Sequence, residues 1–152
     1  MTVLLDTNIL LRLANPVDPA QSTAVTAIAA LRATGAALCT VPQNLFEFWV
    51  AATRPVSNNG LGLSTTECLT EIARIKIAFP VQLDSPALLA EWEKLVAAHD
   101  CKGKIAHDAR LVAAMQILGI AQIMTFNISD FTRFPGLTIL DPAKLSVAIA
   151  TP

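Results

Sequence analysis

The sequence alternates short apolar runs of strand length with longer stretches that have helical periodicity. The first run, 3–5, contains no polar residue, which is typical of a strand buried on both faces of a sheet. Alternation of this kind favours a parallel sheet with helices on both faces, so the predicted fold class is α/β. The predicted strands span residues 3–5, 37–41, 79–83, 122–125 and 137–140.

Residues that begin or end helices fall between these runs. Ser64 and Glu67 have the spacing of a capping box, Pro42 suits the first turn of a helix, and Gly119 suits a helix end. Residues 55–62 have the composition of a loop. The predicted helices span residues 7–15, 20–33, 42–53, 65–77, 86–99 and 105–118, with a further short helix after Pro142.

Length and composition limit the class of protein. The 152 residues suit one domain, predicted over 1–152, and 53% hydrophobic with 15% charged residues excludes a disordered chain. A membrane span needs ~20 consecutive apolar residues, and charged or amide side chains interrupt every apolar stretch. The first apolar run contains Asp6 and has no basic start, so we expect no signal peptide and a cytoplasmic protein.

Charge and cysteine usage exclude further classes. Eleven basic and twelve acidic residues give a net charge of -1, which excludes a protein whose main task is to coat nucleic acid. An enzyme that holds nucleic acid through a metal and a few local cations stays possible. The three cysteines and two histidines have no zinc-site spacing, and we expect Cys39 and Cys68 to be core residues.

Four acidic residues are candidates for chemistry. Asp6 follows the first strand, Asp130 follows the strand at 122–125, and Asp108 lies above the apolar stripe of its helix. Each has an ordinary alternative role, as a turn residue, a helix cap or an acid favoured by the helix dipole. Glu47 shares its helix face with Gln43 and Asn44, a pattern that by itself favours a solvated polar face.

Taken together, these acids indicate a metal site. Asp6 and Asp130 lie after the strands at 3–5 and 122–125, and these two strands can be neighbours in a doubly wound sheet, whose functional crevice lies at the carboxyl ends of the strands. Carboxylates that converge there repel one another unless a cation lies between them. Oxygen ligands without His or Cys select Mg²⁺ or Mn²⁺, and such ions commonly assist phosphodiester cleavage.

The whole constellation resembles the PIN domain, and most closely VapC-type toxin ribonucleases. The matching segments are Val3-Leu4-Leu5-Asp6-Thr7-Asn8, Glu47, residues 107–114 and residues 125–131. The resemblance implies a three-layer α/β/α sandwich with a central parallel sheet. It also implies a Mg²⁺- or Mn²⁺-dependent endoribonuclease that forms homodimers and is inhibited by a cognate antitoxin. The helical hairpin from 42 to 77 would correspond to a variable clip that contacts partners.

The resemblance also implies residue roles. Asp6 and Asp108 would be the principal metal ligands, Glu47 and Asp130 would complete the catalytic acids, and Thr7, Thr125 and Asn127 would support them. Cations close in sequence to the proposed ligands are candidates for RNA contact, and these are Arg12, Lys102, Lys104 and Arg110. No Ser or Cys is placed beside a His as a nucleophile, so water is the predicted nucleophile.

Other readings of the first strand and its acid are weaker or stay open. A haloacid-dehalogenase-type phosphatase needs a second Asp where this chain has Asn8, and the paired acids and late Lys of a response-regulator receiver are missing. A housekeeping PIN-domain RNA-processing nuclease and a non-catalytic PIN-like binding module remain as alternatives. A small overlapping upstream gene that encodes a DNA-binding protein would favour the toxin.

Overall fold

The sheet of this protein consists of four short parallel strands in the order β2-β1-β3-β4. The computed structural model describes residues 1–149, with side chains as far as Leu145. The strands are β1 (Thr2–Leu5), β2 (Ala37–Cys39), β3 (Gln122–Met124) and β4 (Thr138–Leu140). In the register, Leu4 of β1 faces Cys39 on one side and Ile123 on the other. The strand order therefore reverses at β1, which has neighbours on both sides.

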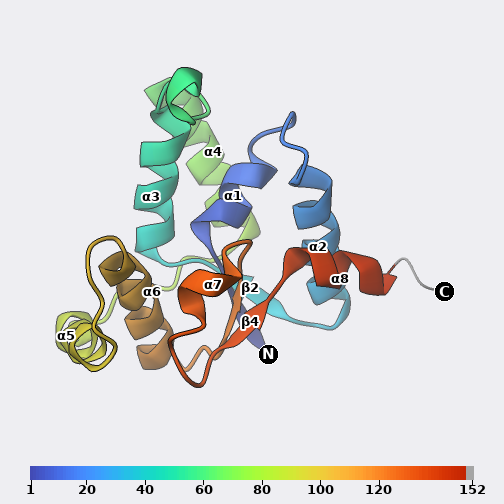
Figure 1. Cartoon of the computed structure of the whole chain (residues 1–152). Helices are drawn as coiled ribbons and strands as arrows, with labels where there is room; N and C mark the ends of the chain where they lie inside the picture. The colour runs from blue at the N-terminus through green and yellow to red at the C-terminus, as the bar shows by residue number, and fades with distance from the viewer. Residues whose placement is uncertain (150–152) are drawn as a thin grey trace.

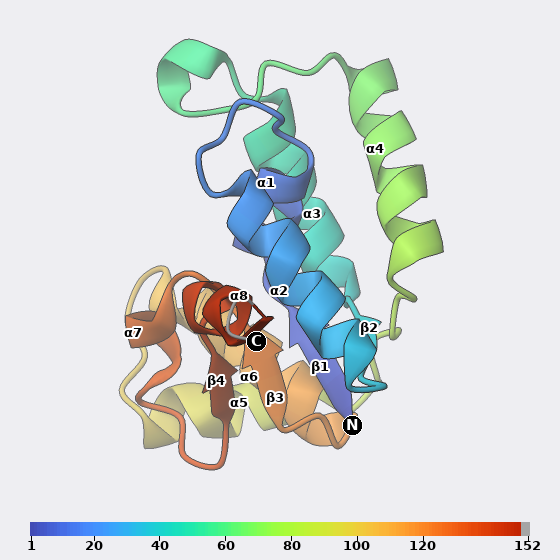
Figure 2. The ribbon, with the colours of Figure 1, turned by 90° about the vertical axis from the view of Figure 1, so that its right-hand side faces the viewer.

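Helices cover both faces of this sheet (Figures 1 and 2). Val3 and Leu5 point into a core with α1, α2, α3 and α4, whereas Leu4 points into a second core with α5 and α6. All three side chains are fully buried, because successive residues of a strand face opposite sides of a sheet. The predicted three-layer α/β/α sandwich is confirmed. The helices are α1 (Thr7–Leu13), α2 (Gln21–Ala33), α3 (Pro42–Thr53), α4 (Thr65–Ala78), α5 (Leu88–Ala98), α6 (Ile105–Ile117), α7 (Ile128–Phe131) and α8 (Pro142–Ile149).

Several predicted helix ends are confirmed. The capping box forms at the start of α4, where the Glu67 N–H donates to Ser64 Oγ at 3.2 Å and the Ser64 N–H donates to Glu67 Oε2 at 2.8 Å. Pro42 occupies the first turn of α3. Gly119 follows α6 with φ +67°, a left-handed conformation that favours glycine. Cys39 and Cys68 are buried in the core, as predicted.

One prediction of secondary structure was wrong. Residues 79–83 form no strand, and their pairing with the sheet is a single parallel bridge between Thr40 and Val81. Pro80 lacks an N–H that could extend the pairing toward the sheet, and Leu83 is 75% exposed, so the pairing stops at this bridge. The segment after β3 contains a short helix, α7, and the predicted loop at 55–62 includes a 3₁₀ turn at Val56–Asn58.

The described residues include no helix that is long and apolar enough to cross a membrane.

Candidate active site at the carboxyl ends of the strands

Asp6 lies where β1 passes into α1, at the carboxyl end of the sheet. Its backbone N–H donates to Met124 O at 3.0 Å, which joins it to the end of β3. The carboxylate is only 8% exposed, and its Oδ1 accepts from the Thr7 N–H at 2.7 Å. Oδ2 accepts from Asn8 Nδ2 at 2.7 Å and from Thr125 Oγ1 at 2.6 Å. Asp6 is therefore both the cap of α1 and part of a buried polar cluster.

Thr125 connects the ends of β1 and β3. Its fully buried hydroxyl donates to Asp6 and accepts from Asn8 Nδ2 at 2.9 Å and from the Asn127 N–H at 3.0 Å. Asn8 Oδ1 in turn accepts from the Phe126 N–H at 3.1 Å. The supporting position predicted for Thr125 is thus occupied by a hydroxyl with three partners. Asn8 was not among the predicted site residues, although its place two residues after Asp6 was the available signal.

Glu47 reaches this cluster from α3. Its Oε2 accepts from Thr7 Oγ1 at 2.7 Å and its Oε1 accepts from Gln43 Nε2 at 2.8 Å. Asn44 Nδ2 also contacts the Thr7 hydroxyl, at 3.3 Å. Gln43 is 5% exposed and Asn44 is fully buried, so the solvated face that this pattern favoured by itself is wrong. The polar side of α3 faces the ends of the strands, and no sequence pattern gave that direction.

Asp108 and Asp130 line an open hollow of about 300 Å³ beside this cluster. Asp108 lies in the first turn of α6, above Leu111, Val112 and Met115, which are buried as the predicted stripe requires. Asp130 comes from α7. No donor among the described residues bonds to either carboxylate. The other residues that line the hollow are Glu47, Lys104, His107 and Asn127.

The electrostatics of the site follow from burial and like charge. Burial raises the pKa of Asp6 from 3.8 to about 6, against the hydrogen bonds from Thr125 and Thr7, and the charges of Glu47 and Asp130 raise it further. Burial also raises the pKa of Asp108 to about 6. The charges of Asp130, Asp6 and Glu47 act in the same direction, and Lys104 opposes them. The four acids therefore lie within electrostatic reach of one another, at one end of the sheet.

The donor set fits a hard cation that takes few protein ligands. Within residues 1–149, no group of three or more His, Cys, Asp or Glu side chains is arranged to hold a metal ion by itself. Mg²⁺ commonly binds through one or two carboxylates, and water and substrate phosphate complete its coordination. Asp108 and Asp130 offer oxygens without protein donors, and the Asp6 carboxylate lies within electrostatic reach of both. These residues fit a Mg²⁺ or Mn²⁺ ion that is held by one or two carboxylates and completed by water and phosphate. They do not form a site in which the protein supplies every ligand.

The raised pKa of Asp6 predicts a pH-dependent stability in metal-free buffer. The folded state holds this proton more tightly than the unfolded chain does, so stability falls as pH rises from about 4 to about 6 and the loss is complete above that. The loss from Asp6 alone is on the order of 3 kcal/mol. Urea unfolding of the wild type and of Asp6→Asn at several pH values isolates the contribution of Asp6. The difference between their free energies of unfolding should change only between pH about 4 and about 6. A constant difference would contradict the buried, repelled carboxyl.

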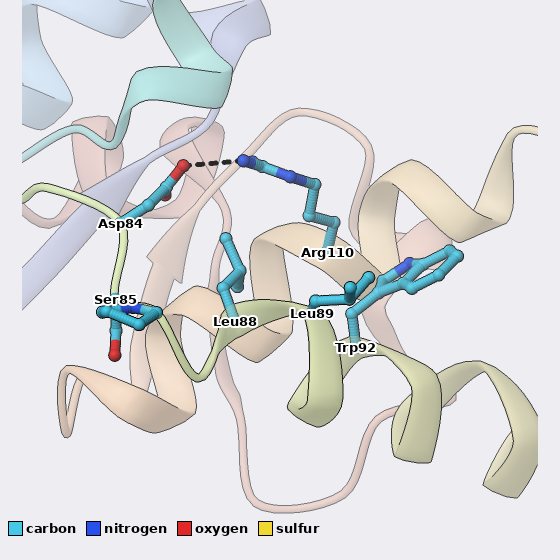
Figure 3. A pocket seen from close by; sticks show the side chains of 7 residues that line it. Asp84, Ser85, Leu88, Leu89, Trp92 and Arg110 are labelled. Carbon is cyan, nitrogen blue, oxygen red and sulfur yellow. Dashed lines mark hydrogen bonds and ion pairs between the residues drawn. The ribbon is translucent and has the colours of Figure 1, made fainter.

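The four predicted RNA-contact cations have different surroundings. Arg110 donates from Nη2 to Asp84 Oδ2 at 2.7 Å and from Nη1 to Gln43 Oε1 at 2.9 Å (Figure 3 shows the ion pair). The Arg12 guanidinium lies 4.5 Å from the centre of the Phe126 ring. Lys102 is 81% exposed and pairs with Asp100 at 2.9 Å. Of the four, Lys104 lines the hollow with Asp108 and Asp130.

Known proteins resemble this chain in structure only. No family profile matches the sequence, and no curated protein matches it. Three solved structures illustrate the likeness. The structure of VapBC2 from Rickettsia felis, bound to promoter DNA, covers 93% of this chain and 98% of its own, with 14% identity and a TM-score of 0.71. VapBC-1 from nontypeable Haemophilus influenzae has the same coverages, 16% identity and a TM-score of 0.66. VapC20 from Mycobacterium tuberculosis, a sarcin–ricin-loop-cleaving toxin, covers 80% of this chain and 86% of its own, with 21% identity and a TM-score of 0.59.

These identities are too low to carry an activity from one chain to another. The structural matches do establish the architecture, because they extend over nearly the whole of both chains. This chain has the PIN-domain fold of the VapC-type toxin structures.

Proposed function

We propose that this protein is a Mg²⁺- or Mn²⁺-dependent endoribonuclease, formed by a single PIN domain over residues 1–152, and that it is the toxin of a toxin–antitoxin pair. One observation carries the proposal. Asp6, Glu47, Asp108 and Asp130 lie together at the end of the sheet where the strand order reverses, in a fold shared with VapC-type toxins.

The chain's own residues have distinct proposed parts in the reaction. Asp6 and Asp108 would hold the ion, and Thr125, Asn8 and the Thr7 N–H keep Asp6 in place. When bound, the ion supplies an activated water and offsets negative charge on the phosphate. Glu47 or Asp130 would accept the proton of the attacking water. The water oxygen would bond to phosphorus as the bond to the 3′-oxygen breaks, which leaves a 5′-phosphate and a 3′-hydroxyl.

RNA contact is proposed first for Lys104, because it lines the same hollow as Asp108 and Asp130. Lys102 is a weaker candidate because it pairs with Asp100, and Arg12 and Arg110 are weaker candidates because each already has a contact within the protein. Replacing Lys102 and Lys104 together should flatten the salt dependence of RNA binding. An unchanged slope would assign both lysines to the ordinary surface.

The proposed protein partners are a cognate antitoxin and a second copy of this chain. Phe46 is 66% and Val50 58% exposed on α3, and both line an open, largely apolar groove that Glu47 also lines. Exposed apolar side chains that adjoin a site are typical of a partner interface. The neighbouring VapBC-1 and VapBC2 structures bear the names of toxin–antitoxin pairs. A monomer by light scattering at micromolar concentration would contradict self-association.

The test of the proposed reaction is cleavage of single-stranded RNA with analysis of the product ends. We expect cleavage that EDTA abolishes and that Mg²⁺ or Mn²⁺ restores, with 5′-phosphate and 3′-hydroxyl ends. RNA with a 2′-deoxy sugar at the scissile position should still be cut, because the 2′-hydroxyl is not the proposed nucleophile. Cleavage that survives EDTA and leaves a cyclic phosphate would overturn the mechanism.

Two further observations distinguish the toxin from a binding module and from a housekeeping nuclease. RNA binding without cleavage, in the presence of Mn²⁺, would favour a PIN-like binding module. Cleavage without a neighbouring antitoxin gene would favour a housekeeping RNA-processing nuclease.

A further inference from the structure

A chain of four side chains leads from the surface to Glu47. Asp84 accepts from Arg110 Nη2 at 2.7 Å, and Arg110 Nη1 donates to Gln43 Oε1 at 2.9 Å. Gln43 Nε2 donates to Glu47 Oε1 at 2.8 Å. Figure 3 shows the outer end of this chain, where Asp84 and Arg110 form an ion pair and line a pocket with Leu88. A carboxylate proposed to act in catalysis is therefore connected to a surface ion pair.

Gln43 can adopt only one orientation in these surroundings. Its Nε2 also donates to His107 O at 2.8 Å, so both amide protons face acceptors while Oε1 faces the Arg110 guanidinium. A flipped amide would place its oxygen against the Glu47 carboxylate and the His107 carbonyl, and its NH₂ against a cation. Because the side chain is 5% exposed, water cannot replace these partners at little cost.

Gln43 also joins two helices that carry different acids. It lies on α3 with Glu47, and its partners His107 and Arg110 lie on α6 on either side of Asp108. The amide therefore ties the backbone that carries Glu47 to the turn that carries Asp108. A side chain with three such partners can fix the separation of two acids without contacting a substrate.

We propose that Gln43 is a positioning residue for Glu47, and that Arg110, held by Asp84, orients Gln43. This inference rests on the proposed function, because it assigns Glu47 a part in the reaction. It also changes the proposed role of Arg110, which was predicted to contact RNA because it lies close to Asp108 in sequence. Arg110 acts through Gln43, and its charge is already paired with Asp84.

The test compares Gln43→Met, Arg110→Met and the double variant with the wild type. Met keeps the length of the Gln43 side chain and most of the aliphatic stem of Arg110, and in each case it removes the hydrogen bonds. We expect Gln43→Met to lower kcat about 10-fold with KM within about 2-fold, because Glu47 loses a hydrogen-bond partner. It should also weaken Mn²⁺ binding without RNA by about 10-fold, because the turn that carries Asp108 loses its hydrogen bond to α3. Mn²⁺ binding is measured by electron paramagnetic resonance. Arg110→Met should give a smaller loss of the same kind, and none in the Gln43→Met background.

Gln116→Met is the matched control, since Gln116 is an exposed glutamine near the end of α6 and should leave kcat and Mn²⁺ affinity unchanged. A rise in KM with a flatter salt dependence in Arg110→Met, equal in both backgrounds, would show direct RNA contact and overturn the relay.

A crystal structure of Gln43→Met decides the inference independently of activity. A Glu47 carboxylate displaced from its position in the wild type supports it, and an unmoved Glu47 overturns it. If wild-type protein fails to cleave RNA, the proposed function fails, while this structural comparison still decides the positioning role.

Discussion

Asp108→Asn is expected to lower kcat for RNA cleavage by about 10²–10⁴-fold while the fold is retained. The substitution keeps the shape of the side chain and removes the charge that would hold the ion. No donor in the described chain bonds to the Asp108 carboxylate, so the change leaves no partner stranded. Stability above pH 6 should rise slightly, because one of four mutually repelling charges is gone. Cleavage at saturating Mn²⁺ measures the loss of activity. Circular dichroism shows that the fold is retained, and thermal melting followed by the same signal measures the stability.

Asp100→Asn is the matched control for this variant. Asp100 is exposed, pairs with Lys102, and has φ 46°, a conformation that Asn tolerates well. Its kcat should equal that of the wild type. Wild-type kcat in a folded Asp108→Asn protein would remove Asp108 from the catalytic site.

Thr125→Val should cost about 3–5 kcal/mol of folding stability, and so lower Tm by about 10 °C. Valine fills the same volume and removes a hydroxyl that has three partners in a fully buried position. The variant leaves the Asn127 N–H without its partner, and takes from Asp6 Oδ2 and Asn8 Nδ2 one hydrogen bond each. Urea unfolding at pH 7 in EDTA measures the change.

Thr125→Ser restores the hydroxyl and should recover most of this stability, because it lacks only one methyl group. Thr70→Val supplies the control at an exposed threonine whose hydroxyl bonds within its own helix, where a change within about 0.5 kcal/mol is expected. Equal losses in the valine and serine variants would assign the effect to packing instead of hydrogen bonding.

The part of the site built from strand ends could be predicted from the sequence. Asp6 and Thr125 each follow an apolar run, and the carboxyl ends of neighbouring parallel strands meet at one edge by geometry. Asp108 could be placed for a similar reason, since the helical period puts it above Leu111 and Val112. These inferences use only local spacing and the rules of parallel sheets.

The contacts that fix Glu47 could not be predicted in this way. Polar residues on one helix face, such as Gln43 and Asn44, are as consistent with solvent as with a buried cluster until the helix is docked. The Arg110–Asp84 pair joins residues far apart in sequence, and nothing local marks either as a partner. The strand predicted at 79–83 was wrong because the prediction used apolar composition alone. Pro80 and the exposed Leu83 do not support a strand there.

The two walls of the hollow differ in how freely they can adjust to a bound molecule. Asp108 belongs to a long helix whose next turns, through Met115, are locked into the second core, so this wall cannot shift without disturbing the interior. The opposite wall is the short turn of α7, where Asp130 is half-buried and Asn127 and Ser129 are exposed. Substrates of different shape would be accommodated by movement of the α7 turn, while Asp108 on α6 keeps its position.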